Sequence, residues 1–520
     1  MFKSIGRLVF CLAVALMLAP ASQAAGTAKY YILVVWDGMR PDFVTPALTP
    51  TLYGLREHGV WFANHHPVFP SSTEVNGTAL ATGLFPGHNH IVANTEYRPD
   101  IDPLKPVPTE LLSAVRHGDD LTGARYIAMP TVAERLHARH ETTAIVGAKP
   151  VALLHDRLDR DDDSLDPVWF ADGSLPSSRL AALTNRFGPF PAPASPNLGR
   201  DQWAARCLTE AFWGDQPPRY SLLWLSEPDA SQHMHGPGSP QALAAIRNCD
   251  DRLATILQAL DQRGLREQTD IIIVSDHGFS TIGTLCDVGE TLRQARFNAR
   301  SAWTQPPQSG DVTVVGNGGS VMLYVNGHSP AVISNVVVTL QRQPFSGVIM
   351  SRANLPGTFP LDVVRMDAPT APDIVVALHW DRRPAHDDHP LVEVYNDGYH
   401  GYTPGCGMHV TLSPTDLHNT CVATGPDFRP GVVDTVPSGN VDIAPTLLWL
   451  MGVKANSALD GRVLREAFRG KTGALAKVEL GRREARAELP GGTWSQYLRY
   501  TEVDGERYFE EGAGQWTRSN

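Results

Sequence analysis

The sequence has only one long apolar run, and that run lies at its N-terminus. It extends from Leu8 to Leu18, behind Lys3 and Arg7, and small residues follow it. A membrane-spanning helix needs roughly 20 apolar residues, so this run is too short. A charged start, an apolar middle and a small-residue exit are typical of a secretory signal peptide, which predicts cleavage after Ala24. We therefore expect a secreted or periplasmic protein without a membrane anchor.

An excess of positive charge is also missing. The chain has 44 Lys and Arg against 55 Asp and Glu, a formal net charge of −11. Such a surface does not attract nucleic acid or anionic membranes non-specifically, so we expect no nucleic-acid duplex as a partner. An anionic small molecule would need a local positive feature to bind.

Cysteine is scarce, and internal repeats and low-complexity tracts are absent. Of the six cysteines, the five outside the signal form neither a CxxC pair nor a metal-binding spacing. An oxidising compartment permits up to two disulfides among them, although the spacing does not reveal the pairing. We expect structural or bridged thiols at Cys207, Cys249, Cys286, Cys406 and Cys421.

Apolar, β-branched runs alternate with helical patterns along most of the chain. Continuous apolar runs of this kind fit strands that are buried on both faces, and the alternation predicts an α/β fold with a mostly parallel sheet flanked by helices. Residues 99–121 and 157–200 are rich in Pro, Gly and Asp and are expected to be surface loops. The predicted strands lie at residues 30–36, 142–147, 220–226, 270–275, 373–380 and 419–425.

The pattern divides the chain into four parts. We expect residues 1–24 to form the signal peptide, and residues 25–280 together with 409–455 to form the main core. An α+β subdomain is inserted at 281–408, where a hairpin around Gly316 to Gly319 precedes a helix. The tail, 456–520, is polar and contains a predicted β-hairpin that turns at Asp504 and Gly505.

Three of the predicted strands end in a carboxylate. Asp37 follows the first, Asp229 lies just beyond the third, and Asp276 with His277 follows the fourth. A single Asp in such a place is usually a helix cap or turn residue, but ligands of parallel sheets bind at this edge. Three carboxylates together, two of them with histidines, therefore favour a binding site.

The same residues have the chemistry of zinc ligands. Asp229 and His233 are four apart and project from one side of a helical turn, and mixed carboxylate and imidazole donors favour zinc over calcium or magnesium. We assign Asp37, Asp276 and His277 to one ion, and Asp229, His233 and His409 to a second. Two such ions about 4 Å apart would hold a phosphoryl group between its attacking and leaving oxygens.

A nucleophile is available in "FPSSTEVNGTALATG", residues 69–83. Thr73 lies where an extended segment meets a helix, so it is either an ordinary N-cap or a hydroxyl activated by a metal ion and the helix terminus. Beside the zinc ligands, we favour the nucleophile. Asn76, one turn further, would direct its amide at a phosphate oxygen.

At this point the sequence resembles the type I phosphodiesterase/nucleotide pyrophosphatase branch of the alkaline phosphatase superfamily. The matching segments are "VVWDGMRPD", "FPSSTEVNGTALATGLFPGHNHIVAN", "SEPDASQHMHGP", "IVSDHGF" and "MHVTLSPTDLHNTCVATGPDF", in the family's order. The resemblance implies an alkaline-phosphatase-like fold, two Zn²⁺ ions, a covalent intermediate on Thr73 and an oxyanion role for Asn76. It also implies metal ligation by Thr73 and by Asp37, Asp229, His233, Asp276, His277 and His409. Related sulfatases need a C/S-x-P-x-R pattern, which is absent.

Two positions depart from the family pattern. Nucleotide-cleaving relatives usually have an aromatic residue after the threonine, where this chain has Glu74; Trp224 is the alternative stacking residue. The family usually has Gly after the last histidine ligand, where this chain has Val410, so His400 is a rival to His409. The substrate is expected to be a small phosphodiester or nucleotide. The alternatives are a phosphomonoesterase or phosphonate hydrolase on the same metals, or a non-catalytic binding protein.

Overall fold

The computed structural model describes residues 26–519 apart from 162, 163, 165, 172, 387, 388, 456 and 471–476. The predicted signal peptide lies outside the described residues. Within the described part of the chain, no helix combines the length and the apolar character that a bilayer crossing requires.

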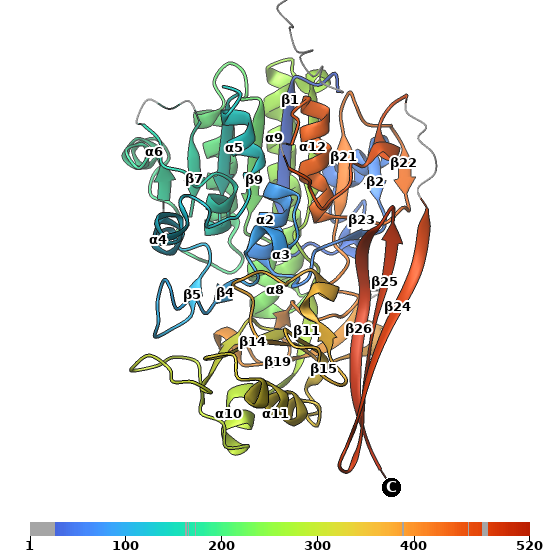
Figure 1. Ribbon diagram of the computed structural model, residues 1–520. Coiled ribbons are helices and arrows are strands. Elements are labelled where there is room, and N and C mark those ends of the chain that lie inside the picture. Colours follow the sequence, from blue (N-terminus) through green and yellow to red (C-terminus); the bar gives the residue numbers. More distant parts are fainter. Residues whose placement is uncertain are drawn as a thin grey trace, which may run out of the picture.

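A nine-stranded sheet forms the centre of the larger part of the molecule (Figure 1). Its middle is parallel: β1 pairs with β10 on one side and with β9 on the other, β9 pairs with β6, and β6 with β7. In spatial order the strands are β22 (Val432–Asp434), β2 (Val60–Phe62), β21 (Cys421–Thr424), β10 (Thr269–Val274), β1 (Tyr30–Trp36), β9 (Tyr220–Leu225), β6 (Thr143–Gly147), β7 (Val168–Phe170) and β8 (Gly173–Leu175).

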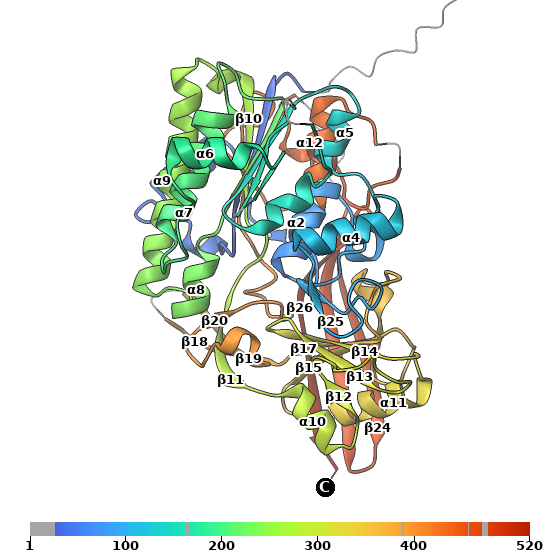
Figure 2. The same cartoon turned by 90° about the vertical axis from the view of Figure 1, so that its left-hand side faces the viewer.

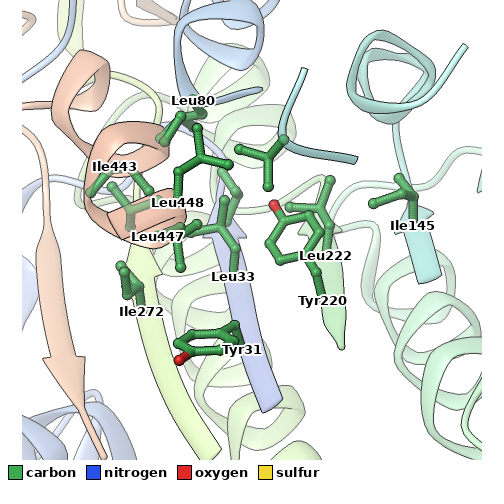
Figure 3. Close-up of a cluster of buried hydrophobic side chains, with 14 of the residues drawn as sticks. Tyr31, Leu33, Leu80, Ile145, Tyr220, Leu222, Ile272, Ile443, Leu447 and Leu448 are labelled. Atoms are coloured by element: carbon green, nitrogen blue, oxygen red, sulfur yellow. The ribbon is translucent and has the colours of Figure 1, made fainter. Parts of the chain in front are cut away.

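Helices cover both faces of this sheet, as the side view shows (Figure 2). Alternate residues of each central strand face opposite layers: Leu33 packs in one apolar cluster and Val34 in the other. One face is covered by α2 (Thr73–Thr82), α5 (Val132–His137) and α12 (Ile443–Met451), and the other by α1 (Pro50–His58), α7 (Leu198–Arg206) and α9 (Pro240–Gln262). Figure 3 shows Leu447 and Leu448 of α12 packed over Leu33 and Ile272.

The local sequence explains where the two clearest helices begin. Pro50 and Pro240 occupy the first turns of α1 and α9, where a missing N–H costs nothing. Ser239 accepts a hydrogen bond from the Ala242 N–H and caps α9. These features were visible in the sequence.

Residues 280–408 form two sheets apart from the nine-stranded sheet. The six-stranded one carries α10 (Val288–Gln294) and α11 (Pro330–Leu340), and the predicted hairpin is β13 and β14, which are antiparallel. We propose these sheets as the inserted subdomain. Their strands are β12 (Ala299–Arg300), β13 (Val312–Gly316), β14 (Ser320–Val325), β17 (Ile374–Leu378), β15 (Ser346–Ser351) and β16 (Phe359–Pro360) in one sheet, and β18 (Trp380–His386), β19 (His389–Asn396), β11 (Ser280–Leu285) and β20 (Gly407–Met408) in the other.

The C-terminal tail is a three-stranded antiparallel sheet of β24 (Val478–Leu489), β25 (Gly492–Val503) and β26 (Glu506–Arg518). The predicted turn at Asp504 and Gly505 joins β25 to β26. This sheet packs against the inserted block, where the Gln496 amide bonds both the N–H and the carbonyl of Ile349.

The predicted strand at 373–380 is β17, which lies within the predicted insertion and belongs to the six-stranded sheet, while β21 joins the main sheet antiparallel to β10. One expectation about the elements needs correction. The regions 99–121 and 157–200 are not only loops, because they contain α4 (Leu112–Thr122), β7, β8, α6 (Arg179–Phe187) and the start of α7. Their Pro, Gly and Asp residues lie between short helices and strands, so the average composition of these regions does not indicate those elements.

Candidate active site

Four neighbouring parallel strands end at one edge of the main sheet, and each is followed by a charged side chain. Asp276, Asp37 and Asp229 follow β10, β1 and β9, and Lys149 follows β6. The lysine Nζ lies 3.0 Å from Asp37 Oδ2 and 2.9 Å from Asp229 Oδ2. The sequence interpretation missed Lys149, although "VGAKP" directly after a buried strand was an available signal.

Each of the three aspartates keeps one buried oxygen without a hydrogen-bond partner among the described residues. These atoms are Asp37 Oδ1, Asp229 Oδ1 and Asp276 Oδ2. An unpaired buried carboxylate oxygen is costly unless a cation faces it. Burial raises the pKa of Asp37 well above its ordinary value and that of Asp276 to about 7. Burial also opposes the charge of Asp229, but Lys149 and His233 outweigh it and lower that pKa.

Three histidines point their Nε2 atoms into the same place. In each, Nδ1 lies within hydrogen-bonding distance of a backbone carbonyl: Gly407 for His233 (3.0 Å), Gly278 for His277 (2.9 Å) and Ser71 for His409 (2.8 Å). A carbonyl only accepts, so Nδ1 carries the proton and Nε2 presents a lone pair. This arrangement is common among histidines that bind metal ions.

Two groups of donors could each hold an ion. One consists of Asp229, His233 and His409, as expected, and its donor atoms lie within 4.8 Å of one another. The other consists of Asp37, Asp229 and His277, so Asp229 contributes to both groups. Asp276 approaches the second group through His277, whose Nε2 is 3.3 Å from Asp276 Oδ2.

The rival sixth ligand, His400, is exposed and lies outside these donor groups. Its ring contacts Tyr399 and Tyr402. The ring of His409, by contrast, is buried and stacks on His277 with 3.7 Å between centroids. The geometry therefore favours His409. The next residue, Val410, has φ 77°, a conformation that is unfavourable for a β-branched side chain and explains why glycine suits that position.

Thr73 is the first residue of α2, and its hydroxyl faces the ligand cluster. Thr73 Oγ1 lies 3.3 Å from His277 Nε2, and the side chain is buried. Ser72, not Thr73, occupies the N-cap position of the helix. A buried hydroxyl at a helix N-terminus, beside imidazole lone pairs and carboxylates, is suitably placed for a nucleophile.

Asn76 does not face the site, contrary to expectation. Its Nδ2 donates to the carbonyls of Val68, Pro70 and Ser72 at 3.1 to 3.2 Å. Its Oδ1 accepts from the Val68 N–H and from Asn440 Nδ2. The side chain is fully buried, and these bonds leave it no free donor. Asn76 instead holds the turn that leads to Thr73.

Asn94 offers the amide that Asn76 does not. Its Oδ1 accepts a 3.1 Å hydrogen bond from the backbone N–H of Glu74, the residue after Thr73. Among the described residues no hydrogen bond engages its Nδ2 group, and the side chain is partly exposed. The sequence interpretation missed Asn94, because it is 21 positions from Thr73 and only the fold brings them together.

Trp224 is not available for stacking on a substrate. It lies in β9, is fully buried, and its Nε1–H donates to Asp37 Oδ2 at 2.8 Å. An aromatic residue within a strand that is covered on both faces contacts neighbouring elements, here the ring of His155. Trp224 therefore orients the Asp37 carboxylate.

Glu74 is also nearly buried, and it faces Glu110. Burial and the Glu110 carboxyl raise the pKa of Glu74 well above its ordinary value. A pair of adjacent carboxyl groups is favoured when the two share a proton. The position after Thr73 thus has a polar, hydrogen-bonding group and no flat apolar surface.

The five cysteines of the described residues are free, and three of them are buried. None belongs to the candidate metal groups.

Several known proteins resemble this chain in sequence. The family profile described as type I phosphodiesterase / nucleotide pyrophosphatase matches residues 31–403. Ectonucleotide pyrophosphatase/phosphodiesterase family member 1 of Rattus norvegicus is 24% identical over 268 residues, which are 50% of this chain and 25% of that protein. Venom phosphodiesterase 2 of Crotalus adamanteus is 24% identical over 262 residues, 49% of this chain and 27% of that protein. The chain thus spans about a quarter of the length of these relatives.

Among solved structures, murine ectonucleotide pyrophosphatase/phosphodiesterase 5 has a similar fold. An inactive variant of that protein, in complex with AMP, superposes with a TM-score of 0.58 at 19% identity and covers 85% of this chain and 100% of its own. The human protein gives 0.56 at 18% identity. These similarities support the alkaline-phosphatase-like architecture.

Proposed function

The chain belongs to the type I phosphodiesterase/nucleotide pyrophosphatase family, and from this premise we propose that it is an exported enzyme that hydrolyses phosphodiester or pyrophosphate bonds of small molecules. One observation carries the proposal. Three buried aspartates, each with an unpaired oxygen, lie beside three imidazole Nε2 atoms, and one of these nitrogens, that of His277, is 3.3 Å from the Thr73 hydroxyl.

The donor set fits two Zn²⁺ ions. Asp229, His233 and His409 would hold one, while Asp37, Asp276, His277 and the Thr73 oxygen would hold the other, with Asp229 between them. When bound, such ions neutralise charge on the phosphoryl group and lower the pKa of coordinated oxygen nucleophiles. The unpaired carboxylate oxygens support this assignment because they need a cation.

Thr73 and Asn94 have different roles in the proposed reaction. The Thr73 hydroxyl loses its proton and its oxygen forms a bond to phosphorus as the bond to the leaving oxygen breaks, and the alcohol or nucleotide half departs with that proton. Water then attacks phosphorus, the bond to Thr73 breaks, and a proton from the water passes to the Thr73 oxygen, which restores the free hydroxyl. The Nδ2 group of Asn94, fixed beside the nucleophile by the Glu74 N–H, donates to a phosphate oxygen whose charge grows in the transition state.

The nucleophile can be tested separately from the metal site. We expect Thr73→Ala to abolish turnover of bis-p-nitrophenyl phosphate while zinc content stays at the wild-type level, and Thr73→Ser to retain part of the activity. Mass spectrometry of wild-type protein acid-quenched during turnover of this diester should show Thr73 carrying a p-nitrophenyl phosphoryl group, because only one of the two ester groups leaves. Undiminished turnover in the alanine variant would refute this role.

Hydrolysis of phosphomonoesters is a second candidate, and Lys149 favours it. A monoester carries more negative charge than a diester and gains more from a nearby cation. Lys149 Nζ lies at the edge of the site between Asp37 and Asp229 and is partly exposed. We expect Lys149→Met to lower kcat/KM for p-nitrophenyl phosphate roughly tenfold more than for the bis ester, a differential effect of about 1.4 kcal/mol. Equal losses on both substrates would oppose the monoester role.

The leaving half of the substrate is the least defined feature. Trp224 is buried and Glu74 is not aromatic, so neither offers a nucleobase a stacking surface. We propose a small substrate whose leaving group hydrogen-bonds near Glu74 and Glu110. A panel of nucleotides, dinucleotides, headgroup diesters and monoesters, assayed with zinc present, would identify the substrate.

A further inference from the structure

A second cluster of possible metal ligands lies away from the candidate active site, where the C-terminal sheet meets the core. It consists of three residues whose donor atoms lie within 4.8 Å of one another. His66 lies in β3 (His65–His66), Glu510 lies in β26, and His418 lies in the loop before β21. His66 belongs to the segment that leads to Thr73, and His418 follows His409 by nine residues. Figure 1 shows β26 passing beside β23 (Ser438–Gly439), the partner strand of β3.

Both imidazole rings have the orientation seen in the active-site histidines. Nδ1 of His66 lies 3.2 Å from the Ser438 carbonyl, and Nδ1 of His418 lies 2.9 Å from the Pro414 carbonyl. Because a carbonyl only accepts, each Nδ1 carries a proton and each neutral ring presents the Nε2 lone pair to Glu510. Nε2 of His66 is buried without a hydrogen-bond partner.

The atoms that face one another are therefore all acceptors when the rings are neutral. His66 Nε2 is 3.4 Å from Glu510 Oε1, and His418 Nε2 is 3.1 Å from Glu510 Oε2. Asn64 Oδ1 lies 3.2 Å from the same His418 nitrogen. Lone pairs held this close repel one another unless a cation lies between them.

Protonation of both histidines would not relieve this repulsion. Two imidazolium rings with centroids 4.5 Å apart would repel each other. A single divalent ion replaces both protons. Two donors on a tetrahedral zinc ion, each bonded at about 2.05 Å, are roughly 3.3 Å apart, close to the distances between Glu510 and the two histidines.

We propose that His66, His418 and Glu510 bind a third, structural zinc ion, with Asn64 Oδ1 beside it. His418 and Glu510 are each about a quarter exposed, which gives the ion a path from solvent. The Thr501 hydroxyl donates to Glu510 Oε1 at 3.0 Å and orients the carboxylate. The ion would fasten the C-terminal sheet to the two segments that carry Thr73 and His409.

Metal content tests this site directly. The full mature chain is dialysed against zinc and then against zinc-free buffer, and bound zinc is measured by atomic emission. Glu510→Gln keeps the size of the side chain and its bond to Thr501, and we expect it to bind one equivalent less than wild type. His418→Ala should lose the same equivalent. Glu502→Gln is the matched control, because Glu502 pairs with Arg507 on the same sheet and faces neither histidine; it should bind as wild type does.

Anomalous diffraction at the zinc edge locates the ion independently of stoichiometry. A peak bounded by His66, His418 and Glu510 in wild-type crystals, absent in Glu510→Gln, is the expected result. Zinc content unchanged in both Glu510→Gln and His418→Ala, with no peak at this position, would overturn the proposal. This result would not bear on the proposed hydrolase activity, because that activity is tested through Thr73 and is measured as turnover.

Discussion

Replacing Asn76 with alanine separates a structural asparagine from a catalytic one. Removing the amide leaves the Val68 N–H without an acceptor and deprives Asn440 Nδ2 of one of its two. It also takes a donor from three loop carbonyls. Each buried group left unsatisfied costs roughly 1–3 kcal/mol, and some groups find new partners, so we expect a loss of about 3–5 kcal/mol. In a chain of this size, that corresponds to a melting temperature lower by roughly 3–5 °C.

The assay compares Asn76→Ala with Asn94→Ala. Thermal unfolding at a fixed scan rate and kcat for bis-p-nitrophenyl phosphate are measured for both variants. We expect Asn94→Ala to melt near the wild-type temperature and to lose roughly 10²–10³ in kcat, as when an oxyanion donor is removed. An Asn76→Ala protein that melts like wild type but loses activity on that scale would refute the reasoning and restore Asn76 as the phosphate ligand.

Two further predictions concern buried polar groups outside the reacting atoms. Trp224→Phe removes the donor to Asp37 Oδ2 and should weaken zinc binding roughly 10–100-fold in a chelator competition. Turnover of nucleotide and non-nucleotide substrates should fall equally. A loss of turnover confined to nucleotides would mean that the ring stacks on a base. Asp270 has its pKa raised to about 9 by burial and by Asp427. Because this value lies above that of the unfolded chain, the contribution of Asp270 to stability is complete below about pH 4 and is lost as the pH rises through about 9. Asp270→Asn has a neutral side chain that still donates a hydrogen bond, so the urea midpoint of this variant should fall less than that of wild type between pH 5 and 8. If the urea midpoints of the two proteins changed in parallel with pH, the raised pKa of Asp270 would be wrong.

Much of the candidate site was visible in the sequence because its residues are tied to recognisable strands and turns. Asp37, Asp229 and Asp276 follow apolar runs, and a residue that follows a strand lies at the sheet edge wherever the strand is placed. The interval of four between Asp229 and His233 likewise fixes their shared face. Lys149 also follows a strand, β6, but a lone lysine in the sequence does not reveal that it will contact Asp37 and Asp229.

The roles of Asn76, Asn94 and Trp224 could not be predicted in this way. Each depends on where a side chain points within a packed environment, and proximity in sequence was misleading. Asn76 is one turn from Thr73 but turns back to bond its own loop. Asn94 is remote in sequence but is held beside Thr73 by the Glu74 N–H.

The sequence by itself determined the α/β class, the strand ends that carry the carboxylates and the position of Thr73 at the start of a helix, because these follow from local periodicity and chain order. Only the tertiary structure decided that Asp229 lies between two donor groups and that Trp224 supports Asp37. It alone placed His66, His418 and Glu510 together. Such contacts join residues up to several hundred positions apart, and their geometry is set by how sheets and helices pack, which no local pattern encodes.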